Sequence, residues 1–527
     1  MTVMSVPRPA WAPPRSARAL RLEFKRNAVP YVLPLLAAVF YFDTLRTAGG
    51  FPPVWTPRAS VIGDHMLLEF SVFAGGLVAW AGSREGRRKT VDLVAATPRA
   101  PWARRSIALA GALCWMLLAF LAGVAVLYIQ TALQATWGGP PLWPVFAGAA
   151  GVTVVTVLGF TAGVLFPGRF TAPLVAIGVV LLDQVGFREA LNVTGTGGAS
   201  ILPSPPTSAT YALLSPANSP PLLDGGVYYH LAPDVSIVQV MFMGGIAVAL
   251  FGVLGLMPGL RELGSAGGLR SLRAVFTRGD GWLSRAVAVL LVGCGVAASG
   301  TAFALAGTAQ VDTVTGGWEI PALHSAASDQ PVPAAPDCTF SSGFQVCVHP
   351  AFGFYLHNVA TALDLVAAQI AGLPGAPVRA QEVASVSGGQ DVQSGISGNP
   401  PVFEFTAERV GTLFGEFYGN DPVVWPEEFQ QGLLEAFLTG PSQYAGSAPN
   451  LLDPAQLAVA DVLLTAVGSQ PMHASNSGQP ALKSGLATEI FAAAQRFARL
   501  SAGARHAWLA THLTAMRAGQ ITLAQIP

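Results

Sequence analysis

Seven long apolar segments alternate with loops in this chain, and its Lys and Arg residues gather in every second loop. Of the 22 Lys and Arg residues among the first 309, 19 lie in the N-terminal arm and in the loops after the second, fourth and sixth segments. Only Arg46, Arg58 and Arg188 lie in the other loops. Because cytoplasmic loops retain Lys and Arg during membrane insertion, the basic side is predicted to face the cytoplasm. After an odd number of spans, the remainder of the chain then lies outside.

Each apolar segment approaches the length of a membrane-spanning helix. A helix that rises about 1.5 Å per residue needs about 20 residues to cross roughly 30 Å of hydrocarbon. The second and fifth segments are short, and the first is interpreted as an uncleaved anchor because no clear signal-peptidase site follows it. The predicted fold class is therefore a membrane all-α, polytopic bundle. Its predicted spans are residues 28–45, 66–82, 107–133, 144–166, 170–185, 235–257 and 286–309.

The distribution of charge agrees with this topology. Charged residues make up 11% of the chain, whereas soluble domains carry about 25%. The net charge of zero hides a split, because residues 1–309 hold 22 basic and 12 acidic side chains and residues 310–527 hold 7 and 17. A basic half suits the anionic inner leaflet of a membrane. Nucleic-acid binding is not expected, since the basic residues are committed to the membrane surface. Abundant Ala, Gly, Pro and Arg with little Lys favours a bacterial plasma membrane.

The C-terminal part is predicted to be a mostly helical α+β domain outside the membrane. Its periodicity indicates helices at residues 352–373, 426–438, 453–467, 485–500 and 504–517, and strands at 378–386 and 402–407. Cys338 and Cys347 lie nine residues apart at its start. In an oxidising compartment, such a pair favours a hairpin disulfide over a metal site. No metal site is predicted anywhere in the chain.

Two basic segments have a possible role beyond setting the topology. Residues 16–27 place apolar and basic side chains on different helical faces, which indicates either an interfacial helix or a charged flank. The loop at residues 82–105 opens with charges, continues as a short stretch with helical potential, and stops at Thr97-Pro98. A short helix here would transmit force from a soluble partner to two spans. The alternative is a solvated basic loop.

Residues 16–260, which include this loop, resemble a type-2 ABC exporter permease. That family has an interfacial N-terminal helix, six spans, and a first cytoplasmic loop with the pattern Arg-Glu, Thr-x-Asp-Leu and Pro. In the family, this loop is a coupling helix that docks on an ATPase subunit. The matching positions are Arg84, Glu85, Thr90, Asp92, Leu93 and Pro98.

The chain departs from the family pattern in three ways. Lys89 replaces the usual glycine before Thr90, the loop at residues 187–233 is long, and a seventh span with an external domain follows the sixth. Together, the resemblance and the pattern of apolar segments predict the following organisation: residues 1–27 form a cytoplasmic arm with an interfacial helix, 28–260 a six-span permease domain, 261–285 a cytoplasmic basic loop, 286–309 a seventh transmembrane helix, 310–337 a linker, and 338–527 the extracytoplasmic domain.

The sequence contains no phosphate-binding Gly-x-x-x-x-Gly-Lys-Ser/Thr motif, no His-Glu-x-x-His and no Gly-x-Ser-x-Gly. The chain is therefore expected not to be an enzyme and to need no cofactor of its own. The resemblance implies that ATP is bound by an ABC ATPase partner, and that permeases pair as a homodimer or heterodimer. The alternative function is a membrane-anchored sensor or adaptor whose acidic domain binds a ligand without transport.

Two acidic residues lie at membrane depth in the outer halves of predicted spans. Glu69 lies in the second span and Asp183 in the fifth. A charge near mid-bilayer costs roughly 2.5–3.5 kcal/mol on insertion scales, so such residues tend to face the bundle interior. Glu69 and Asp183 are therefore candidates for lining a transport pathway. Asp43 and Asp64 are interpreted as interfacial residues.

Overall fold

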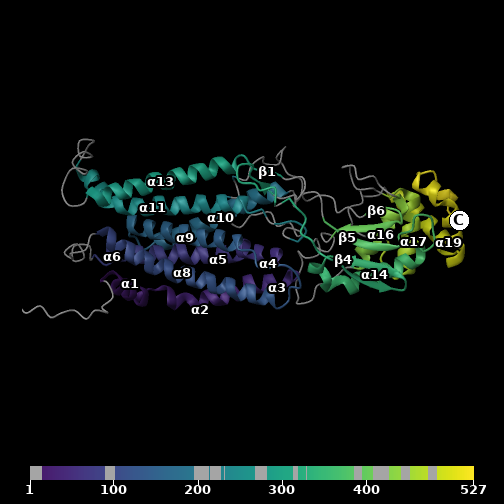
Figure 1. The fold of residues 1–527 in the computed structure, drawn as a ribbon, viewed down its shortest axis with the longest axis horizontal. Coiled ribbons are helices and arrows are strands. Elements are labelled where there is room, and N and C mark those ends of the chain that lie inside the picture. Colours follow the sequence, from purple (N-terminus) through teal and green to yellow (C-terminus); the bar gives the residue numbers. More distant parts are fainter. Residues whose placement is uncertain are drawn as a thin grey trace, which may run out of the picture.

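The molecule consists of a long bundle of helices with a smaller domain at one end, and that domain contains a β-sheet (Figure 1). Helices α1 and α6 lie at the opposite end of the bundle from this domain (Figure 1). The computed structural model describes residues 15–89, 101–194, 210, 213, 227–230, 232–266, 282–311, 318–327, 329–384, 395–406, 426–440, 452–472 and 484–527.

All seven apolar segments of the sequence are helical. Two of the helices contain π-helical segments, η1 and η2. The helices of the bundle are α1 (Arg15–Arg26), α2 (Val29–Phe40), η1 (Tyr41–Leu45), α3 (Arg46–Gly50), α4 (Trp55–Val61), η2 (Ile62–Met66), α5 (Leu67–Gly82), α6 (Arg84–Arg87), α8 (Pro101–Ala132), α9 (Trp143–Leu165), α10 (Thr171–Thr194), α11 (Asp234–Ala266) and α13 (Trp282–Ala306).

Within the described residues, six helical stretches are long and apolar enough to cross a membrane by length and composition. Five of them coincide with predicted spans: Val29–Gly50, Pro101–Ala132, Trp143–Leu165, Asp234–Leu256 and Leu283–Ala306. The second and fifth predicted spans correspond to shorter apolar helices, Leu67–Gly82 and Thr171–Leu182.

The sixth stretch, Pro350–Ile370, belongs to the smaller domain. It contains η4 (Pro350–Tyr355) and α14 (Leu356–Ile370). Val359, Leu363 and Val366 of α14 are buried in one core with residues of the sheet. A helix that buries one face against a sheet in this way is apolar because it fills a core. We therefore assign this stretch to the domain and not to the bundle.

Small residues allow the bundle helices to pack closely. A Cβ atom on Gly159 of α9 would lie 2.5 Å from the carbonyl oxygen of Gly75 on α5. A Cβ on Gly295 of α13 would overlap the carbonyl oxygen of Gly245 on α11. Glycine lets two helix backbones approach in this way, which is the usual basis of helix association in membranes.

The smaller domain is built on a five-stranded sheet with the order β3-β4-β5-β7-β6. β3 and β4 form an antiparallel hairpin, β4, β5 and β7 are parallel, and β6 is antiparallel to β7. Strands β5 and β7 and all five helices occupy segments predicted from the sequence. The elements of this part of the chain are β1 (Gln310–Val311), β2 (Trp318–Glu319), β3 (Asp337–Ser341), β4 (Phe344–Val348), β5 (Arg379–Val383), β6 (Gly395–Ser397), β7 (Val402–Thr406), α16 (Pro426–Thr439), α17 (Pro454–Ala466), α18 (Ser484–Ala498), α19 (Ala502–Arg517) and η7 (Leu523–Gln525).

Candidate functional site

The start of the loop at residues 82–105 is tied to the N-terminal helix. Arg84 Nη2 lies 3.3 Å from Glu23 Oε1 of α1. Helix α1 is in turn held on α8, because Phe24 stacks on Trp115 with ring centroids 4.2 Å apart and Trp115 Nε1 donates to the Phe24 carbonyl oxygen at 2.8 Å. Arg84 is thereby linked to α1 through Glu23, and α1 packs on α8.

The same short helix, α6, also contacts the end of α5 and the turn before α10. Arg87 donates to Ser83 Oγ and to the Trp80 carbonyl oxygen, both at 2.8 Å, and its guanidinium lies 3.2 Å from the centroid of the Trp80 ring. A cation in this position complements the negative end of the α5 dipole and the face of the indole ring. A Cβ on Gly86 would overlap the ring of Pro167. Thus α6 packs against two further elements of the bundle.

Only the first part of the predicted coupling motif lies in the described part of the chain. Arg84 and Glu85 belong to α6, and Glu85 is half-buried there. Thr90, Asp92, Leu93 and Pro98 lie outside the described residues.

A second candidate site lies where the two π-helical segments meet. Segment η1 carries Asp43 and η2 carries His65, and His65 Nδ1 lies 3.2 Å from Asp43 Oδ2. Short π-helical turns within α-helices occur frequently at functional sites, because the extra residue in the turn redirects the neighbouring side chains. The two π-segments thus bring together an acid and an imidazole that are 22 residues apart in the sequence.

Glu69 lies behind this pair, at the start of α5. The residue is only 7% exposed, and neither carboxylate oxygen accepts a hydrogen bond from any described group. Asp43 and Thr44 are its polar neighbours. Thr44 is fully buried, and its hydroxyl also makes no hydrogen bond within the described residues. Unsatisfied polar groups at such depth are costly, and in this cluster a carboxyl group and a hydroxyl group are both buried.

The other acidic candidate from the sequence is Asp183. Asp183 belongs to α10, and its side chain lies outside the part that the structure describes. The sequence predicts Asp43 to be a plain interfacial residue and does not single out Thr44. No local sequence signal marks the π-helical turn that brings both of them beside Glu69.

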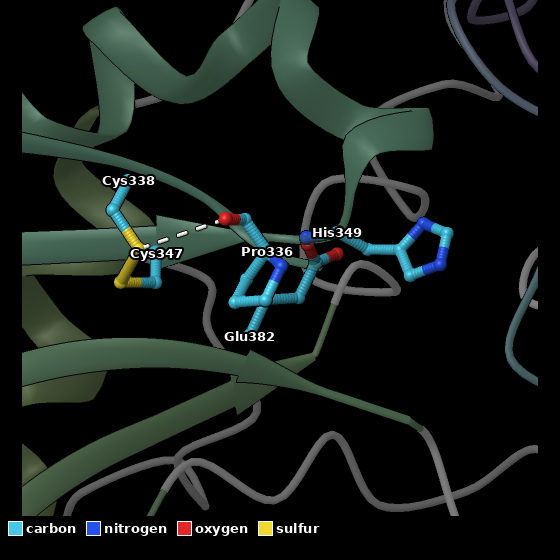
Figure 2. Close-up of a disulfide and its surroundings, with 5 residues drawn as sticks. All are labelled: Pro336, Cys338, Cys347, His349 and Glu382. Atoms are coloured by element: carbon cyan, nitrogen blue, oxygen red, sulfur yellow. Dashed lines mark hydrogen bonds between the residues drawn. A yellow bond between two sulfur atoms is a disulfide. The ribbon is translucent and has the colours of Figure 1, made fainter. Parts of the chain in front are cut away.

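In the smaller domain, the predicted disulfide is confirmed. Cys338 of β3 and Cys347 of β4 are bonded and face each other across the hairpin (Figure 2). Two residues later, the backbone N–H of His349 donates to Glu382 Oε2 at 2.7 Å, and Tyr355 donates to Glu382 Oε1 at 2.6 Å. The hairpin is thereby anchored to a buried carboxylate of β5.

The His349 ring points away from the disulfide (Figure 2) and contacts residues that precede the domain. Its centroid lies 5.0 Å from the ring of Trp137 and 4.9 Å from that of Tyr228. Next to it, Thr136 Oγ1 donates to the Pro350 carbonyl oxygen at 2.7 Å. These contacts join the loop between α8 and α9 to the smaller domain, which we call the sheet domain. We call His349, Trp137, Tyr228, Thr136 and Pro350 the junction.

The junction is expected to weaken in acid. Burial lowers the pKa of His349 from 6.5 to about 4, against a smaller opposing effect of Asp337. Because the pKa in the folded state is below that in the unfolded state, the stabilising contribution is complete above pH 6.5. As the pH falls from 6.5 toward 4, stability declines by up to about 1.4 kcal/mol per pH unit.

The measurement is the unfolding midpoint of the full chain as a function of pH. His349 Nδ1 accepts from the backbone N–H of Ala351 at 3.1 Å, so asparagine can replace this acceptor without titrating. His349→Asn should flatten the pH dependence in this window. His357→Asn, which removes an exposed imidazole of α14, controls for the loss of a histidine. An unchanged slope in His349→Asn would contradict this account.

Comparison with known protein families, with curated proteins and with solved structures finds no match to this chain.

Proposed function

We propose that this chain is the membrane-spanning permease subunit of an ATP-driven exporter in a bacterial plasma membrane. In this proposal it crosses the membrane seven times, with the N-terminus in the cytoplasm and the sheet domain outside. A separate ATPase binds the nucleotide and docks on the loop at residues 82–105. Two permease subunits assemble into the transporter as a homodimer or heterodimer.

The observation that carries the proposal is the set of contacts made by α6. This short helix begins the docking loop, and it is in contact with α1, with the end of α5 and with Pro167 before α10. A subunit that pushed on this loop would therefore move several helices together.

The arrangement of the two ends of the molecule supports the proposed topology. Helices α1 and α6 lie at one end of the bundle and the sheet domain at the other (Figure 1). Reporters that are active on only one face of the membrane, placed at Thr97 and at Asn450, are expected to report opposite compartments. The same compartment for both would refute the proposed topology.

The docking role of the loop makes a specific prediction. We exchange residues 90–98 for a Gly-Ser segment of equal length. Because the partner loses its docking surface, ATPase activity is expected to be absent when the tagged chain is purified. The measurement is ATP hydrolysis by the complex purified from its native membranes. An exchange of residues 200–208, in a loop predicted to lie on the other side, is the matched control.

The possible outcomes separate the proposed function from its alternative. If no nucleotide-binding protein is purified together with the wild-type chain, the sensor or adaptor function is favoured. If the chain with the exchanged loop is purified with as much ATPase as the wild type, the partner docks elsewhere and the proposed coupling site is wrong.

A further inference from the structure

We propose that Glu69, Thr44 and Asp43 form a proton-binding site inside the helical bundle, in which Glu69 holds an exchangeable proton. The proton enters from the aqueous side past Asp43 and His65. This site does not depend on an ATPase partner, so it can be tested independently of the proposed function.

The first argument is the environment of the Glu69 carboxyl group. It is 7% exposed, and neither of its oxygens has a hydrogen bond of regular geometry within the described residues. A buried carboxylate without a counter-ion is strongly disfavoured, whereas the neutral acid costs far less. The neutral acid also has an O–H to donate, and the buried Thr44 hydroxyl and the Asp43 carboxylate are the neighbouring acceptors.

No described basic side chain neutralises Glu69 in place of a proton. Helix α9 contains no ionisable residue at all. Arg58 of α4 is buried but donates to the carbonyl oxygens of Phe51 and Pro52, while Arg46 of α3 is exposed. On α8, the Tyr128 hydroxyl donates to the Pro141 carbonyl oxygen at 2.6 Å. The side chain of Asp183 on α10 lies outside the described residues.

The second argument is the route to the surface. The side chain of Asp43 is 52% exposed and that of His65 is 35% exposed, and the two are in contact at 3.2 Å. A proton taken from a hydronium ion passes first to this pair and then to the Glu69 carboxylate. No bond between heavy atoms forms or breaks. An imidazole and a carboxylate can each accept and release a proton, which is the chemistry that such a transfer requires.

The third argument is that the backbone is modified where the site requires it. The polar side chains around Glu69 come from two π-helical segments. Asp43 and Thr44 belong to η1, and His65 belongs to η2. A continuous α-helix would have placed these side chains at different angles. Two such irregularities facing each other in apolar helices indicate a functional constraint.

Infrared spectroscopy of the purified full chain in lipid nanodiscs tests the proposal, because it distinguishes a carboxylic acid from a carboxylate. At neutral pH the wild type is expected to show a carboxylic-acid carbonyl band that shifts in D₂O. Glu69→Gln should remove this band. Glu489→Gln, which neutralises an exposed carboxylate of α18, should leave it unchanged. Asp43→Asn should keep the band and slow its shift in D₂O, because the entry route is damaged.

Two further measurements keep the result unambiguous. If Glu69→Gln does not fold, Glu69→Asp should move the band without removing it. Spectra in sodium, potassium and choline salts test for a bound metal cation. The proposal is overturned if Glu69→Gln leaves the band intact, if the wild type has no such band at neutral pH, or if the band appears only when sodium and potassium are absent.

Discussion

Replacing Gly295 by alanine is expected to force α13 away from α11 and to destabilise the bundle by about 1–3 kcal/mol. The new Cβ would overlap the carbonyl oxygen of Gly245 and lie 2.5 Å from the backbone nitrogen of Ala249. Both of these atoms belong to the backbone of α11, so no side-chain rotation can relieve the clash. The helices would have to separate, and the close contact that holds α13 in place would be lost.

Gly293 on the same helix provides a matched control. A Cβ at this position would have no atom within 4 Å. Both substitutions gain about 1 kcal/mol of helix propensity, so the difference between the two variants reports the clash alone. Thermal unfolding of the purified full chain in detergent is the measurement. Equal midpoints for the two variants would mean that α13 does not pack on α11 as described.

Loss of the Cys338–Cys347 disulfide is expected to reduce the stability of the sheet domain by about 2–3 kcal/mol, because the bond closes a short loop in the unfolded chain. The bond also fastens β3, which is an edge strand with mostly exposed residues. Strand β4 is buried and leads directly to His349. The loss should therefore be felt at the junction as well as in the hairpin.

Denaturant unfolding of the full chain, followed by tryptophan fluorescence, measures this effect in the variant with serine at both positions 338 and 347. A reducing agent should lower the stability of the wild type to that of the double variant and should not change the double variant. Cys294→Ser alters a free cysteine on α13 and controls for the change of a thiol. A double variant as stable as the wild type would contradict the expected contribution.

The sequence was a good guide wherever a property depends on neighbouring residues. Apolar segments of sufficient length became helices, because a helix satisfies every backbone group within the segment itself. The helices of the smaller domain were predicted from their periodicity and from start signals such as Asp453-Pro454, where Asp453 caps α17. The disulfide was also predicted, since its cysteines are only nine residues apart.

The tertiary structure alone decided which distant residues meet. Asp43 contacts His65 only because two helices each contain a π-helical turn at the same level. The parallel pairing of β5 with β7 and the contact of Trp137 with His349 join segments that no local pattern links. Helical and strand periodicity describe how one segment presents its own faces. Which faces come together depends on packing across the whole chain, and the Glu69 cluster and the junction both arise at that level.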